Sequence, residues 1–174
     1  MMGLWAGTAH VYNEQGVYEP EASSSSIARI AWKEGSTTEF LFTQVELNAD
    51  TAAQAIKDEQ DATKKTLRQH VSTLLGQSIK FHVDGKGATG ESDTFNVIGT
   101  ETMPGIYLFQ LAFKPGLGQD GGVYYNNQYF LDSSQRNIIG PYVDGERKTQ
   151  HVIAQTFARI SYDPGKLNAL PGVT

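Results

Sequence analysis

The sequence predicts one mainly β domain, an antiparallel β-barrel of about eight or nine strands with one α-helix inserted near residues 50–75. Three observations lead there. Short β-prone runs separated by turn residues recur along the chain, one long stretch has helical spacing instead, and the last strands follow one another through short connections. Strands connected in this way form an antiparallel meander, and so many of them must pack as two layers or close into a barrel.

The N-terminal part predicts three strands. The first is expected over 4–12, the second over 27–32 and the third over 40–47. Glu34–Ser36 is a turn signal between the last two, which we therefore expect to form a hairpin. The serine run 23–26 is expected to be a polar connection before the second strand.

The pattern then changes to that of a helix. Residues 48–75 contain no Gly or Pro and are rich in good helix formers. Residues 51–54 match a capping box, and Gly76 stands where a glycine commonly ends a helix. Apolar residues recur at helical spacing only toward the C-terminal end of this stretch, so we expect that half to pack on the core and the first half to be solvated.

The C-terminal part contains the clearest strand signals. Short strands over 79–83 and 95–98 are expected on either side of the glycine-rich loop 84–90. The four strands that follow are expected at 107–113, 123–131, 137–143 and 149–162. We take residues 1–174 as a single domain, with 163–174 as a loosely held tail because Pro and Gly are frequent there.

Composition narrows the function classes. Lys and Arg number 14 against 19 Asp and Glu, a net charge of −5, which argues against a nucleic-acid-binding protein. The absence of cysteine excludes disulfides, a thiolate nucleophile and Cys-ligated metals. No window approaches the roughly 18–20 apolar residues of a membrane span, and the first residues lack the pattern of a secretory signal. We therefore expect a cytoplasmic protein.

No catalytic or metal-binding motif stands out. In the glycine-rich loop Lys86 is followed by Gly87, whereas a phosphate-binding loop needs Ser or Thr there, so a hairpin connection is the better interpretation. No histidines are spaced for a zincin site, and no serine lies in a nucleophile elbow. We expect no metal and no cofactor. If the protein is an enzyme, the candidates for proton transfer are His10, Tyr12, Glu46 and His82.

Tyrosines and amides are concentrated in the C-terminal strands. A tyrosine combines an apolar ring with a hydroxyl, which is the combination that lines small-molecule pockets. The segment 123–130 has polar residues on both of its faces, which indicates a wet or liganded interior. An ordinary β-core with hydroxyls at its rim is the alternative interpretation.

Gly3-Leu4-Trp5 resembles the G-x-W that opens the first strand of lipocalin-like (calycin) barrels, a superfamily that includes fatty-acid-binding proteins and bilin lyases. Arg159 stands in the last strand where the arginine partner of that tryptophan is expected. The resemblance implies that Trp5 and Arg159 close the base of a cup-shaped cavity for a small apolar or aromatic molecule. The inward residues that would contact this ligand are Tyr12, Trp32, Phe42, Tyr107, Phe109, Tyr125 and Tyr129.

Three functions remain open at this point. The first is binding of a small hydrophobic or aromatic ligand in the barrel. The second is a cofactor-independent lyase, isomerase or cyclase that acts on such a molecule in the same cavity. The third is a protein-interaction module that uses the helix, and the sequence also leaves homo-oligomerisation open.

Overall fold

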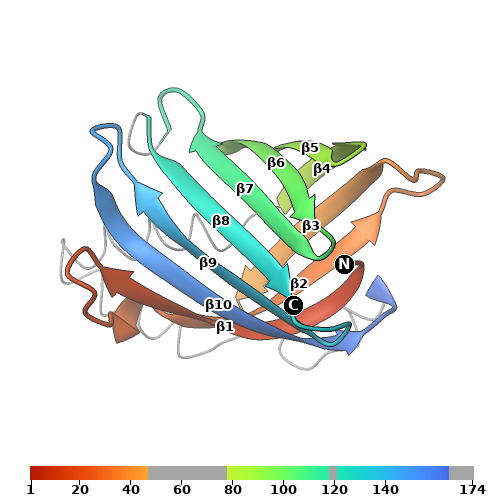
Figure 1. Cartoon of the computed structure of the whole chain (residues 1–174), viewed down its shortest axis with the longest axis horizontal. Coiled ribbons are helices and arrows are strands. Elements are labelled where there is room, and N and C mark those ends of the chain that lie inside the picture. Colours follow the sequence, from red (N-terminus) through yellow and green to blue (C-terminus); the bar gives the residue numbers. More distant parts are fainter. Residues whose placement is uncertain (47–77, 118–120, 165–174) are drawn as a thin grey trace.

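The chain folds into a closed antiparallel barrel in which every strand pairs with its neighbours in sequence (Figure 1). The computed structural model describes residues 1–46, 78–117 and 121–164. Within these ranges there is a short 3-10 helix, Pro20–Ala22, and ten strands. The strands are β1 Gly3–Asn13, β2 Ser24–Trp32, β3 Glu39–Glu46, β4 Ser78–Asp84, β5 Gly87–Glu91, β6 Phe95–Met103, β7 Ile106–Phe113, β8 Val123–Phe130, β9 Gln135–Val143 and β10 Thr149–Ser161.

Pairing of β1 with β10 closes the barrel. Residues Leu4 to Asn13 run antiparallel to β10, and β1 pairs on its other side with β2. The prediction of a mainly β antiparallel barrel is therefore confirmed. The expected helix near 50–75 and most of the expected tail, 165–174, lie outside the described residues. No helix in the part of the chain that the structure describes is long and apolar enough to cross a membrane.

One strand, β5, was not predicted. It comes from the glycine-rich stretch that we expected to be a loop, and it pairs with both β4 and β6. A tight turn at Gly85, with φ +59°, joins it to β4. Gly90 faces the ring of Phe81, and a Cβ at this position would lie 2.8 Å from two ring carbons. Here glycine makes room for a core ring, so its presence marks close packing and not a loop.

The start of β2 also differs from the prediction. Ser24 pairs with Ala9 of β1, so the serines that we expected to be a connection belong to the sheet. The side chain of Ser26 is fully buried, and its Oγ accepts a hydrogen bond of 3.1 Å from Nε2 of Gln44. Pairing on both sides and this buried hydrogen bond explain why a polar run forms a strand here.

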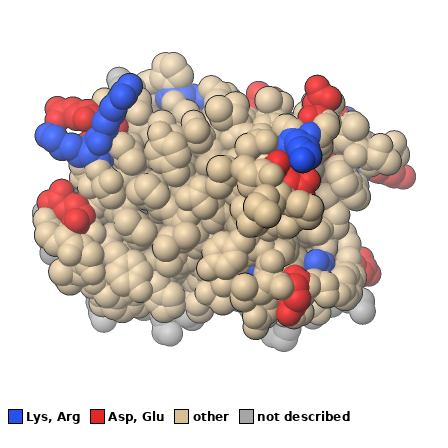
Figure 2. All heavy atoms as spheres, in the orientation of Figure 1, with Lys and Arg blue, Asp and Glu red and all other residues tan. Residues whose placement is uncertain are grey.

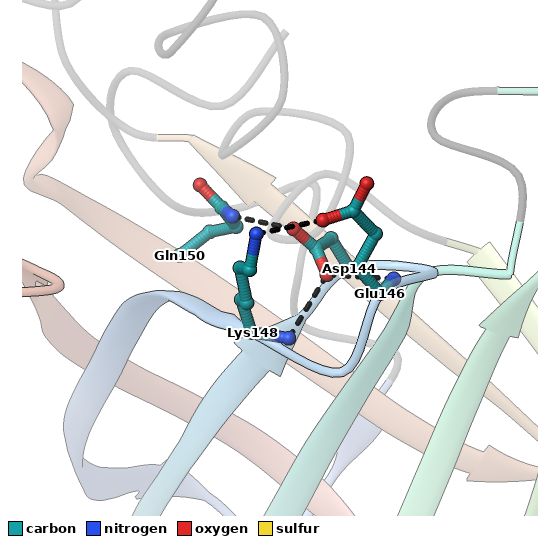
Figure 3. Close-up of polar contacts among 4 residues, drawn as sticks. All are labelled: Asp144, Glu146, Lys148 and Gln150. Carbon is teal, nitrogen blue, oxygen red and sulfur yellow. Dashed lines mark hydrogen bonds and ion pairs between the residues drawn. The ribbon is translucent and has the colours of Figure 1, made fainter.

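The β9–β10 hairpin is held by Asp144 (Figure 3). Its Oδ1 accepts backbone hydrogen bonds of 2.9 Å from Glu146 and from Lys148, and its Oδ2 accepts one of 2.6 Å from Nε2 of Gln150. These bonds, the backbone bond from Lys148 first, lower the pKa of Asp144 below its ordinary value. These hydrogen bonds hold the turn that joins β9 to β10.

The outer face of β7 to β10 carries no Lys, Arg, Asp or Glu. These four strands contain two such residues, Arg136 and Arg159, and both lie on inward positions. Figure 2 shows this side of the molecule, with charged atoms mostly near its edges. The exposed outward residues include Ile106, Leu108, Gln110, Tyr125, Tyr129, Gln135, Ile139, Thr156, Ala158 and Ile160.

Candidate functional site

Inward side chains of β8, β9 and β10 form rows across the interior of the barrel. Arg136 of β9 is paired with Phe157 of β10. Two residues further along β9, Ile138 is paired with Gln155 on one side and with Gln128 of β8 on the other. Directly opposed residues on one face of a sheet have Cβ atoms about 4.5–5.5 Å apart, and diagonal neighbours lie within reach of long side chains. The two glutamines are thus diagonal neighbours of the arginine.

Arg136 is completely buried. Its Nε, Nη1 and Nη2 have no hydrogen-bond partner among the described residues. The guanidinium carbon lies 4.5 Å from the ring centre of Phe157 and 5.2 Å from that of Trp5. Burial, and then the positive charge of Arg159, lower the pKa of Arg136 to about 9. The group therefore remains charged at neutral pH, and a buried charge without a partner costs several kcal/mol.

Arg159 approaches the same tryptophan but is well partnered. Its guanidinium carbon lies 4.1 Å from the ring centre of Trp5. Nε donates a hydrogen bond of 2.6 Å to the backbone oxygen of Ser133, and Nη1 donates to the backbone oxygen of Met2. The contact between Trp5 and Arg159 that the calycin resemblance implies is present, at the end of the barrel where β1 begins and β10 ends.

A small hollow lies inside the barrel, which we call the interior hollow. Its volume is about 40 Å³, which is more than one buried water molecule needs. Pockets for drug-sized ligands measure roughly 300–1,000 Å³, so the interior hollow is smaller than such a pocket. Its lining combines rings, amides and one cation: Met1, Ile30, Phe40, Phe42, Gln44, Ile79, Phe81, Phe109, Leu111, Tyr124, Asn126, Gln128, Arg136, Ile138 and Gln155.

Aromatic packing accounts for the small volume. The rings of Phe40 and Phe81 are stacked with centres 4.7 Å apart, and Phe81 meets Phe109 edge-on at 5.6 Å. Against these rings lie buried amide oxygens without a partner among the described residues, Oδ1 of Asn126 and Oε1 of Gln128 and of Gln155. The amide-rich segment 123–130 was expected to make the interior polar, and two of its amides do face inward.

The predicted ligand contacts divide into two groups. Phe42 and Phe109 line the interior hollow. Tyr107 faces inward beside Phe109, with ring centres 6.3 Å apart. Burial, and then its hydrogen bond to Glu101, raise the pKa of Tyr107 to about 12.

The other four rings do not line the interior hollow, and the expected inward orientation is wrong for Tyr12, Tyr125 and Tyr129. Tyr125 and Tyr129 alternate with the inward amides of β8, so they face outward and are exposed. Tyr12 alternates with buried Val11 and packs against Tyr18 on the outside, with ring centres 5.7 Å apart. Trp32 does lie on the inward face, because it is paired with Phe40 and the two ring centres are 5.7 Å apart, but it stands at the end of β2 and is 45% exposed.

The structure does not bring the proton-transfer candidates together. His10 is exposed on the outer face of β1, and His82 is exposed on the outer face of β4. Strands β2 and β3 lie between them. Tyr12 shares the outer face with His10. Glu46 ends β3, opposite Ser26, and its side chain lies outside the described residues. His10, Tyr12 and His82 therefore do not meet inside the barrel, because their strands present the neighbouring residues to the interior.

A larger hollow, of about 850 Å³, lies along β2 to β6 and is lined mostly by outward residues, including Arg29, Lys80 and His82. Its polar groups are open to solvent or already paired. Lys33 and Glu39 form an ion pair with an N–O distance of 2.5 Å. Arg29 donates to the backbone oxygen of Pro164 at 2.9 Å. The interior hollow is thus the better candidate, because its polar groups are buried and unmatched.

Arg136 and Gln155 were not predicted as site residues. A signal was available for Arg136, because it alternates in phase with Ile138 and Tyr142, which are both buried. The same reasoning places Gln155 inward, in phase with Ile153 and Phe157. We found no group of three or more His, Cys, Asp or Glu placed to hold a metal ion in residues 1–46, 78–117 and 121–164.

Comparison with known protein families and with curated protein sequences finds no match. Comparison with solved structures finds similar folds. A protein of unknown function from the DUF3598 family of Nostoc punctiforme is 11% identical, with a TM-score of 0.59 over 92% of this chain. The chain spans about half of that protein, 47% of its length. An S-type phycobiliprotein lyase from Guillardia theta is 8% identical, with a TM-score of 0.54 over 91% of this chain and 87% of the lyase. At these identities the likeness concerns the fold alone.

Proposed function

We propose that the barrel binds a small molecule with an apolar or aromatic body in its interior. One observation carries the proposal: buried amide oxygens of Asn126, Gln128 and Gln155 are unmatched, while the hollow that these residues line is otherwise walled by aromatic and aliphatic side chains. Leaving a buried acceptor unpaired costs about 1–3 kcal/mol, and a ligand that donates hydrogen bonds recovers this free energy.

The size of the interior hollow limits how the ligand binds. A space of about 40 Å³ holds only a few atoms. The deeply buried part of the ligand is therefore a small polar group, and a larger body requires lining side chains to move. Phe42 is the ring best suited to move, because it is only half buried whereas Phe40, Phe81 and Phe109 are buried.

Membership of the calycin superfamily is part of this proposal. The closed meander, the contact between Trp5 and Arg159, and the similarity in fold to a phycobiliprotein lyase support it. A lyase, isomerase or cyclase remains the second candidate, since a fold of this kind serves a lyase in another protein. The interaction module rests on residues 50–75, and homo-oligomerisation and the cytoplasmic location are likewise predictions still to be tested.

A pair of neighbouring substitutions tests the binding site. Ile138 faces the hollow and is 2% exposed, whereas Ile139 faces outward and is 48% exposed. Ile138→Trp fills the hollow, and Ile139→Trp adds the same ring outside. Native mass spectrometry and melting curves with indole, 1-decanol and decanoate measure binding.

We expect one or more of these probes to raise the melting temperature of the parent protein and of Ile139→Trp, but not that of Ile138→Trp. Equal responses of the two variants would place binding outside the barrel. A parent protein that carries no added mass and responds to none of the probes would contradict the proposed function.

A further inference from the structure

We propose that Arg136 is the anchor for a carboxylate group, so that the interior ligand is an organic anion. This inference rests on the proposed function and specifies the chemical class of its ligand. The observation behind it is a guanidinium that is completely buried, lines the interior hollow, and has no hydrogen-bond partner on any of its three nitrogens among the described residues.

No acidic side chain of the described residues neutralises this charge. The ion pairs found there involve Lys33 with Glu39 and Lys148 with Glu146, all at the surface. The inward carboxylate of β6, Glu101, is engaged elsewhere. It accepts a backbone hydrogen bond of 3.4 Å from Gly105 and one from the hydroxyl of Tyr107. The charged group that acts on Arg136 is another cation, Arg159, and the two repel each other. An anion is therefore the partner that the site lacks.

The surroundings of Arg136 fix its position without using its N–H groups. The rings of Phe157 and Trp5 lie 4.5 and 5.2 Å from the guanidinium carbon, close enough for cation–π attraction. All five N–H donors remain available. A guanidinium presents these donors in a planar fork that matches the two oxygens of a carboxylate, and such charge-assisted pairs are the strongest hydrogen bonds in proteins.

The neighbouring rows suit a carboxylate that carries a larger body. Gln128 and Gln155 flank Ile138 one row away, and their side-chain amides can donate to the anion through N–H and accept from a ligand hydroxyl or N–H. A volume of about 40 Å³ suits a three-atom carboxylate group. The same hollow is lined further on by Phe40 and Phe81, where an apolar or aromatic body would lie.

Calorimetric titration with matched probes tests the charge. Decanoate and 1-decanol share the same chain and differ in the head group, and acetate supplies the carboxylate without the chain. The variants are Arg136→Met, which keeps a long apolar side chain without the charge, and the control Arg147→Met. Arg147 is exposed in the β9–β10 turn, so its loss changes the net charge equally outside the barrel.

We expect decanoate to bind the parent protein and Arg147→Met alike, and to bind Arg136→Met at least about tenfold more weakly, the loss expected for one or two charged hydrogen bonds. Binding of 1-decanol should not depend on Arg136. Acetate binding that requires Arg136 would mean that the site takes small free carboxylates as well, and its absence alongside decanoate binding would mean that the body is needed. Either result supports Arg136 as the anchor of the carboxylate.

Decanoate affinity that is unchanged in Arg136→Met would overturn the inference while leaving the proposed function intact. So would binding of 1-decanol as tight as that of decanoate. If indole, 1-decanol and both carboxylates all fail to bind, both the proposed function and the inference about Arg136 fail. Melting curves without ligand add a second readout: an anchor kept for a ligand predicts that Arg136→Met melts no lower than the parent, whereas a structural arginine predicts that it melts lower.

Discussion

Two arginines approach the same ring, Trp5, from neighbouring strands, and their surroundings are opposite. Arg159 lies at the end of the barrel, partly open to solvent, and donates to the backbone oxygens of Met2 and Ser133. Arg136 lies inside, fully buried, and donates to no group of the described residues. These are the only Lys, Arg, Asp or Glu residues in β7 to β10.

The difference separates a structural role from a proposed binding role. Arg159 ties the N-terminal segment to the connection between β8 and β9, so its hydrogen bonds stabilise the closure of the barrel. We expect Arg136 to lower stability, because its charge is removed from water and matched by nothing in the described chain. A residue that costs stability in this way is expected where a ligand supplies the missing partner.

The largest effect is expected when the shared ring is removed. Trp5→Ala leaves a large cavity in the core and frees both arginines from their contact, so we expect a loss of about 3–5 kcal/mol in the free energy of unfolding. Urea denaturation followed by circular dichroism measures it. Trp32→Ala is the control, because this ring is 45% exposed and should cost far less. Equal losses would mean that the ring of Trp5 is not central to the core.

Arg159→Met tests the structural role assigned to Arg159. The substitution removes two charge-assisted hydrogen bonds at a partly exposed site, and we expect a loss of about 1–3 kcal/mol in the free energy of unfolding. The same denaturation experiment applies. Binding of decanoate in excess should be retained, and selective loss of binding with full stability would reverse the roles assigned to the two arginines.

Arg136→Met should not lower the free energy of unfolding, in contrast to Arg159→Met. Replacing an unpaired buried charge by an apolar side chain of similar length is expected to leave the free energy of unfolding unchanged or to raise it by about 1 kcal/mol. Comparison of the two arginine variants in one denaturant series decides the sign. A loss as large as that of Arg159→Met would show that the contacts with Trp5 and Phe157 outweigh the burial of the charge.

The smallest effect concerns the tyrosines that face the interior. Burial is the main reason that the pKa values of Tyr107 and Tyr142 are raised to about 12, from an ordinary value of 10. Their neutral forms are thus favoured by folding. The stability that they contribute is complete below pH 10 and declines as the pH rises toward 12. Melting temperatures across this range should fall less steeply for Tyr107→Phe than for the parent, and identical slopes would exclude a contribution from Tyr107.

The barrel itself was predictable from local signals. Alternation in 107–113 and the Asp144-Gly145 turn indicate antiparallel strands, and the structure has them within one or two residues of the expected bounds. Predictions failed where packing overrides local preference. Gly90 lies in a strand because the ring of Phe81 needs the space, and Ser26 is buried because Gln44 donates to it.

The site was predicted only in part, because a shift of one residue reverses the face of a strand. In β8 the tyrosines at 125 and 129 were expected inward, yet Asn126 and Gln128 take those positions. Phe42 and Phe109 were placed correctly on the inner wall. Arg136 was passed over, since a charged residue in a strand is more often solvated than buried.

By itself the sequence determined the class of fold, since strand length, alternation and turn residues depend on near neighbours in the chain. It also determined that the last strands are rich in tyrosines, amides and phenylalanines. The tertiary structure alone decided which of these face one another. Closure of β1 on β10 and the register of β8, β9 and β10 bring Trp5, Arg136 and Gln155 to one interior, and such long-range pairing leaves no trace in the spacing of residues along the chain.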